Sequence, residues 1–81
     1  MTRISKALRR EAVEACLCSV QFHMDPFQSA GAFSREAIDL AWDAITVVVD
    51  RTLWKFRDLS IEGRAAEWED AAKLLMSGWA P

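Results

Sequence analysis

The sequence predicts an all-α protein, a three-helix arrangement around a long central helix. Apolar residues recur at steps of three and four along most of the 81 residues, which is the spacing of one helix face. Ser5, Ser34 and Ser60 (or Asp58 in place of Ser60) stand at the start of the three periodic segments, where a side-chain oxygen can cap a helix. Pro26 and Gly31 separate the first segment from the second. A chain of this length supports one hydrophobic core, so residues 1–81 are expected to form a single helical domain.

The first helix is expected at about residues 3–20, with Ser5 or Thr2 as its N-cap. Its second half is apolar nearly all round, so its burial should deepen toward the C-terminal end. These apolar residues are Val13, Cys16, Leu17 and Val20. The connection at residues 21–33 should fold back over the core, because it carries several large apolar side chains. They are Phe22, Met24, Phe27 and Phe33.

The second helix is expected at about residues 34–58. Ser34 is its predicted N-cap, and the preceding Phe33 can pack against Ile38 as a hydrophobic staple. Residues 46–49 have the propensity of a strand, but the three-four spacing continues on both sides of them, which indicates helix.

The third helix is expected at about residues 61–77. Gly78 predicts a Schellman motif at its end, with Trp79 packing back against the helix. Its predicted inner face consists of Ile61, Ala65, Trp68, Ala72, Leu75 and Met76.

The second helix carries two apolar stripes. One stripe forms its predicted core face, and consists of Ile38, Trp42, Ile45, Val49, Thr52, Phe56 and Leu59. Leu40, Val47 and Trp54 follow one another at steps of seven on roughly the opposite face. A helix that is apolar on two sides needs two surfaces to pack on, and in so short a chain the second surface should be another molecule. The sequence therefore predicts a helical homodimer formed through this helix.

Charged residues flank the second stripe as a polar rim would flank an interface. Asp43 and Asp50 lie on one flank and Arg51 lies on the other. Trp54 is the expected centre of the contact, because tryptophan is enriched at binding hot spots. The predicted partner-binding residues are thus Leu40, Val47, Trp54, Asp43, Asp50 and Arg51.

The net charge of −2 conceals a basic start, since residues 1–10 carry four bases and no acid. Arg3, Lys6, Arg9 and Arg10 are candidates for binding nucleic acid phosphates. They make only a small patch, no helix-turn-helix signature accompanies them, and the isoelectric point is 5.3. We interpret this end as a charged, solubilising one and keep nucleic acid as an alternative partner.

Cysteine and histidine are too few and badly spaced for a metal site. Cys16 and Cys18 point about 200° apart on a helix, and His23 is the only histidine. His23 and Asp25 beside a cysteine could form a nucleophile and base, but nothing in the sequence fixes that geometry. We expect no metal, no cofactor and no enzymatic activity.

We predict a cytoplasmic protein, because its thiols are expected to be reduced and its charged N-terminus is not followed by an apolar signal segment. We also predict no membrane span, because no apolar run reaches about 18 residues. The predicted function is that of a small cytoplasmic protein–protein interaction module acting through the apolar face of the central helix as a homodimer. A small inhibitor or adaptor, for example one encoded by a phage or mobile element, that docks on a larger protein complex is the first alternative. A nucleic-acid-binding regulator that uses the basic N-terminal helix is the second.

Overall fold

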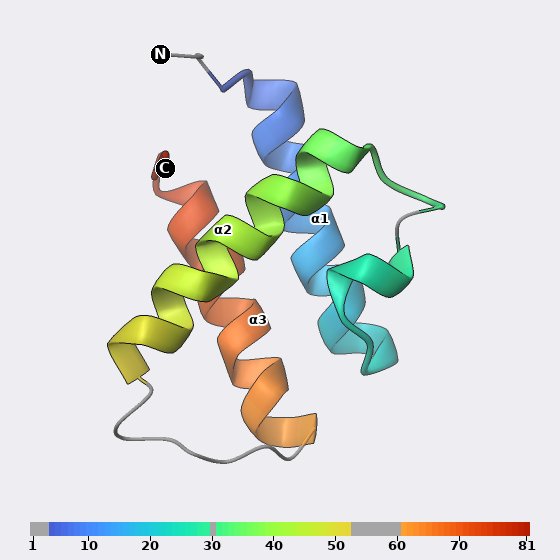
Figure 1. Cartoon of the computed structure of the whole chain (residues 1–81), viewed down its shortest axis with the longest axis vertical. Coiled ribbons are helices and arrows are strands. Elements are labelled where there is room, and N and C mark those ends of the chain that lie inside the picture. The colour runs from blue at the N-terminus through green and yellow to red at the C-terminus, as the bar shows by residue number, and fades with distance from the viewer. Residues whose placement is uncertain (1–3, 30, 53–60) are drawn as a thin grey trace.

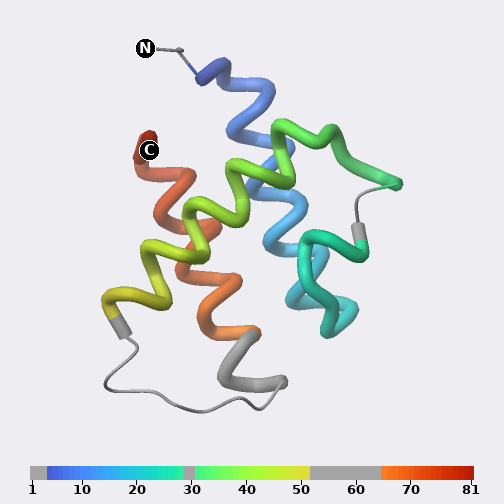
Figure 2. The backbone as a smooth tube through the Cα atoms, viewed as in Figure 1, coloured from blue at the N-terminus to red at the C-terminus, as the bar shows by residue number. Residues whose placement is uncertain are grey.

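The computed structural model describes residues 4–29, 31–52 and 61–81. These residues form three α-helices and one short 3₁₀-helix, with no strand among them: α1 (Lys6–Phe22), η1 (Pro26–Ser29), α2 (Arg35–Thr52) and α3 (Ile61–Met76). Helices α1 and α3 lie side by side and antiparallel, and α2 crosses both of them (Figure 1). The Cα trace extends 33 × 26 × 15 Å, which fits two layers of helices (Figure 2). The predicted all-α class and the three helices are confirmed.

Helix α1 begins where a serine caps it. The Ser5 hydroxyl oxygen accepts a hydrogen bond from the backbone N–H of Leu8 at 3.0 Å, so the helix starts at Lys6 and not at residue 3. The helix runs two residues past its predicted end. His23 ends it in a left-handed conformation, at a φ of 54°, with its N–H directed to the carbonyls of Ser19 and Val20.

Helix α2 begins at a cap that is supported from α1. The backbone N–H of Ala37 donates to the Ser34 hydroxyl oxygen at 3.2 Å, which confirms the predicted N-cap. Ser34 in turn donates twice to Glu11, from its N–H to Oε1 at 2.9 Å and from its hydroxyl to Oε2 at 2.8 Å. Both carboxylate oxygens of Glu11 therefore hold the start of α2 against the middle of α1.

The residues with strand propensity, 46–49, are helical as predicted. Within the described residues α2 has 18 residues, against 17 in α1 and 16 in α3. Residues 53–58 of the predicted second helix lie outside the described residues.

Helix α3 ends in the predicted Schellman motif. Gly78 has a φ of 92°, and its N–H donates to the Leu75 carbonyl at 3.2 Å. The N–H of Trp79 donates to the Leu74 carbonyl at 3.4 Å, and the Trp79 side chain packs against the core.

The centre of the core is built from small side chains. On α2 the buried face is centred on Ala37, Ala41 and Ala44, none of which is exposed. Equally buried alanines stand on the other two helices: Ala12 and Ala15 on α1, and Ala71 and Ala72 on α3. Small residues let helix axes approach closely, so α2 can contact α1 and α3 at once.

The prediction that Leu40 lies on an uncovered face is wrong, because Leu40 is only 5% exposed and belongs to the core. At about 100° per residue, Leu40 lies at one edge of the buried face of α2 and Ile38 at the other, with the alanines between them. Within Arg35–Thr52, the described parts of the two stripes are thus the edges of one wide face, and α2 needs that width because two helices lie beneath it.

Four further positions differ from their predictions. Met76 was expected on the inner face of α3 but is 60% exposed, and Leu17 was expected in the buried half of α1 but is 45% exposed. Phe22 and Phe27 were expected to fold back over the core but are 61% and 69% exposed, whereas Phe33 packs against the core as expected. The exposed residues of α1 and α3 lie beyond the edge of their helix's buried face, where periodicity alone does not decide burial.

Enlarging the side chain at the centre of the α2 face should destabilise the fold. Ala41→Leu adds three carbons to a side chain that is fully buried, and such overpacking costs about 1–3 kcal/mol. Ala66→Leu, on the exposed side of α3, is the matched control and should change the free energy of unfolding by less than about 0.5 kcal/mol. Urea denaturation of both variants measures the difference, and equal stabilities would contradict the close helix crossing.

Glu11→Gln should lower stability at neutral pH and less so in acid. Hydrogen bonds from the Ser34 backbone and then from its hydroxyl hold the pKa of the Glu11 carboxyl below its ordinary value, against desolvation. A lowered folded-state pKa stabilises the fold above the ordinary glutamate pKa, and this contribution disappears as the pH falls through the folded-state value. The urea midpoints of the wild type and the variant should therefore differ at pH 7 and converge in acid below the ordinary pKa. A difference that does not change with pH would contradict the role of the charge.

Candidate interaction surface

Among the described residues, the predicted binding stripe of Leu40, Val47 and Trp54 does not form an exposed apolar surface. Leu40 is buried in the core, Val47 is half-buried, and Trp54 lies outside the described residues. The predicted rim residues Asp43, Asp50 and Arg51 are exposed. Their role in partner binding stays a prediction, but the apolar surface that they were expected to surround has lost Leu40.

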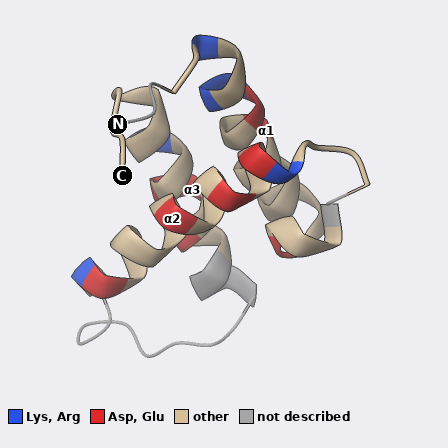
Figure 3. Cartoon of the chain, turned by 45° about the horizontal axis from the view of Figure 1, so that its top comes forward, with Lys and Arg blue, Asp and Glu red and all other residues tan. Residues whose placement is uncertain are grey.

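The outward face of α2 is acidic. Its exposed carboxylates recur at steps of three, four and seven, which places them on one side of the helix: Glu36, Asp39, Asp43 and Asp50. Figure 3 shows acidic residues repeating along α2, with basic residues at its ends. We call these four residues the acidic ridge.

Basic residues meet apolar ones in an open groove between α1 and α3. The groove measures about 570 Å³ and is lined by Lys6, Arg9, Arg10, Val13, Glu14 and Met76. No α2 residue lines it. Three of the four bases that the sequence marked as a phosphate-binding candidate therefore come together here, while Arg3 lies outside the described residues. We call this surface the basic groove.

The cations of the basic groove are available to a ligand. Lys6 and Arg10 are exposed, and Arg9 is half-buried. Glu14 is the one acid in the lining, and no ion pair joins it to these bases within the described ranges. The buried Nε of Arg9 has no hydrogen-bond acceptor there either. Glu11, the other nearby acid on α1, is occupied by Ser34.

Sequence reasoning missed Met76 as part of this surface. Its contribution depends on how α3 sits beside α1, because Met76 is the lining residue that α3 supplies. The only signal in the sequence is its angular position at the edge of the α3 face, next to the core residue Leu75.

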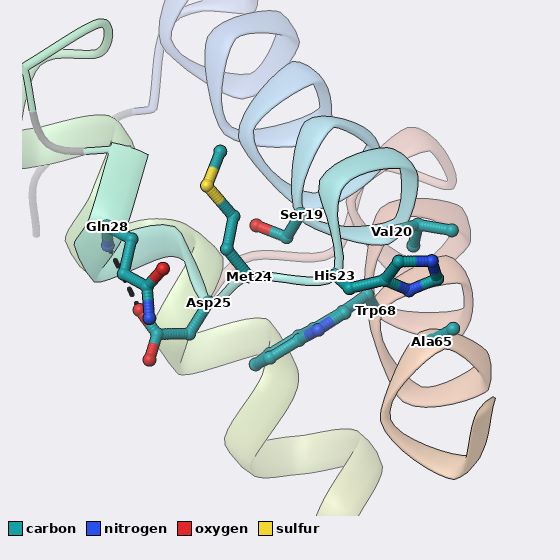
Figure 4. Close-up of a pocket in the computed structure, with 8 residues that line it drawn as sticks. All are labelled: Ser19, Val20, His23, Met24, Asp25, Gln28, Ala65 and Trp68. Atoms are coloured by element: carbon teal, nitrogen blue, oxygen red, sulfur yellow. Dashed lines mark hydrogen bonds between the residues drawn. The ribbon is translucent and has the colours of Figure 1, made fainter. Parts of the chain in front are cut away.

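A second, smaller cavity lies where α1 ends, and measures about 70 Å³. In Figure 4 the His23 ring lies toward Val20 and Ala65, whereas Asp25 turns the other way, toward Gln28. Asp25 Oδ1 accepts the backbone N–H of Gln28 at 3.0 Å. His23 and Asp25 thus do not form the pair of base and orienting group that catalysis by a cysteine would need.

Neither cysteine lines this cavity. Both thiols are free, and burial raises the pKa of the Cys16 thiol to about 12. A thiol with this pKa is protonated at neutral pH and is a poor nucleophile and metal ligand. Across the described residues, no cluster of three or more histidine, cysteine or acidic side chains is arranged to hold a metal ion. The helices of the same residues include none that could cross a bilayer.

Three aromatic rings connect η1, α2 and α3 beside the small cavity. The ring centroids of Phe27 and Trp42 are 6.0 Å apart, and those of Trp42 and Trp68 are 5.8 Å apart at an interplanar angle of 83°. Edge-to-face contacts of this kind stabilise packed aromatic rings. Trp68 is buried, as predicted, while Trp42 is half-buried and packs against the core. We therefore interpret these three rings as packing contacts between η1, α2 and α3.

No protein-family model matches this chain, and no curated protein or solved structure shows significant similarity to it. What the protein binds must therefore be inferred from its own surface, on which the basic groove, at about 570 Å³, is much larger than the cavity at the end of α1.

The two cysteines should differ in reactivity. At pH 8, iodoacetamide should modify half-buried Cys18 in the folded protein and Cys16 at least about a hundredfold more slowly, because a pKa of about 12 leaves almost no thiolate at Cys16. Mass spectrometry of timed digests measures both rates, and unfolding in urea should make them similar. Equal rates in the folded protein would show that Cys16 is not buried as described.

Proposed function

We propose that this protein is a small, noncatalytic interaction module that docks on a larger protein through the basic groove. The observation that carries the proposal is the make-up of that groove, in which Met76 and the edge of the core residue Val13 supply the apolar floor and charged residues supply the rest of the lining. Protein interfaces are commonly built in this way, with an apolar centre and a polar rim. Met76 is 60% exposed, and its flexible thioether side chain can adapt to a partner.

A different protein is a better partner than a second copy bound through α2. A two-fold axis would bring the same face of both copies together, and the outward face of α2 is the acidic ridge. Like charges placed opposite one another oppose association. Of the two described apolar residues that were predicted to make that contact, Leu40 is used inside the molecule and Val47 is half-buried. Homodimerisation through α2 stays a prediction that depends on Trp54, outside the described residues.

The module is proposed as noncatalytic because the residue types that suggested catalysis do not converge. Cys16 is buried and protonated, and His23 and Asp25 turn apart. Two free thiols accord with a reducing compartment, and we propose the cytoplasm as its location.

Site-specific photocross-linking in the source cell tests this proposal. With Met76→p-benzoylphenylalanine we expect a discrete adduct with a larger protein, because the reactive group stands on the floor of the groove. Asp39→p-benzoylphenylalanine, on the acidic ridge, is the matched control and should not give that adduct. Light scattering of the purified protein should give the mass of one chain.

Two outcomes would contradict the proposal. Identical adducts from positions 76 and 39 would mean that the groove has no special role. A mass of two chains, with adducts only between copies, would support the homodimer instead.

A further inference from the structure

We propose that the basic groove binds an acidic segment of its partner, in which one large apolar side chain is flanked by carboxylates. This inference rests on the proposed function and adds the chemistry of the partner. It follows from the charges around the groove, from its apolar floor, and from the remainder of the surface.

The charges favour an anionic ligand. Lys6, Arg9 and Arg10 face the groove against the single carboxylate of Glu14, and no acid among the described residues neutralises these bases. Bases at i, i+3 and i+4 lie about 5–6 Å apart on one side of a helix. Carboxylates at the same spacing on a partner helix can pair with them, and arginine can bind a carboxylate through two parallel hydrogen bonds.

The floor favours a ligand that is also apolar. Val13 and Met76 form it, and exposed Leu17 continues the apolar surface one turn further along α1. The methylene stems of the two arginines add apolar area beside the floor. A volume of about 570 Å³ accommodates one large side chain and its neighbours, in the range of ordinary binding pockets.

Nucleic acid fits this surface less well. Phosphates would use the bases but gain nothing from Val13 and Met76, and a long polyanion would extend past three cations.

A second copy of this chain also fits less well. The acidic ridge would supply the carboxylates but no apolar anchor. The large exposed apolar residues of the described chain all lie outside α2: Leu17, Phe22, Phe27 and Met76. Docking a ridge into a different surface would also be heterologous, and such contacts form open filaments unless they close into a ring.

Selection from a random peptide library tests the inference. Displayed peptides of about twelve residues are selected on the folded wild-type protein, and their sequences should be enriched in aspartate and glutamate around one leucine, phenylalanine or methionine. The affinity of the best peptide is then measured by fluorescence anisotropy. Arg10→Glu and Met76→Gln should each weaken binding by about tenfold or more.

Each variant has a matched control. Arg35→Glu reverses another exposed base, on α2, and Phe22→Gln replaces an apolar residue that is 61% exposed, against 60% for Met76. Both controls should keep the wild-type affinity. Circular dichroism of all four variants should show the same helix content, since every altered side chain is exposed.

The outcomes separate this inference from the proposed function. Enrichment of basic or uncharged peptides whose binding still needs Met76 would overturn the acidic ligand and leave the groove as the docking site. Acidic peptides that bind all four variants equally would overturn the groove as well. Displacement by single-stranded DNA, with no effect of Met76→Gln, would replace the acidic segment with nucleic acid. If no peptide is enriched, the inference fails, and the cross-linking at position 76 decides the proposed function independently.

Discussion

Helix α2 crosses α1 and α3 together, and the side chains at the centre of its buried face are three alanines and Val48. Ala37, Ala41 and Ala44 are fully buried, and so are the alanines that α1 and α3 bring to the same core. Small side chains allow the helices to cross closely. The larger residues therefore pack at the edges of the buried face, with Ile38 at one edge and Leu40 at the other. The buried arc of α2 is therefore wide, and the exposed residues of the helix stand on its opposite side. That side is where its carboxylates stand.

The sequence predicts the elements of this fold much better than the surface they create. Helix ends depend on local chemistry, and the caps at Ser5, Ser34 and Gly78 are confirmed. The burial of Leu40 depends on how many helices lie under α2, which no local pattern reports. Alanine makes this burial harder to predict, because it is a good helix former and also occurs on exposed helix faces. The alanines between the two stripes therefore do not indicate from the sequence that they are buried. Met76 of α3 lines a groove whose other lining residues lie on α1. The sequence patterns of the two helices do not indicate that these residues come together.

The connection between α1 and α2 is fixed from both of its ends. Near its start the Phe27 ring contacts Trp42, which contacts Trp68 in turn. At its end Glu11 holds Ser34 by two hydrogen bonds across 23 residues of sequence. Ser34 uses its hydroxyl in both directions, as an acceptor from Ala37 and as a donor to Glu11. The carboxylate also lies at the N-terminus of α2, where negative charge favours a helix. Glu11 is thereby withdrawn from the bases of α1, and no other acid among the described residues forms an ion pair with those bases.

The same packing places the acids of α2 and the described bases at the start of α1 on two different surfaces. Because α2 buries a wide arc, its acids are confined to the ridge that faces outward from one layer, while the bases of α1 line a groove that contains no α2 residue. A helix with its side chains is about 10 Å across, so roughly that thickness stands between the ridge and the α1–α3 pair. The Debye length at physiological ionic strength is about 8 Å, which screens charges over such a distance. A short acidic ligand in the groove therefore responds mainly to Lys6, Arg9 and Arg10, and the net negative charge of the protein does not prevent its binding.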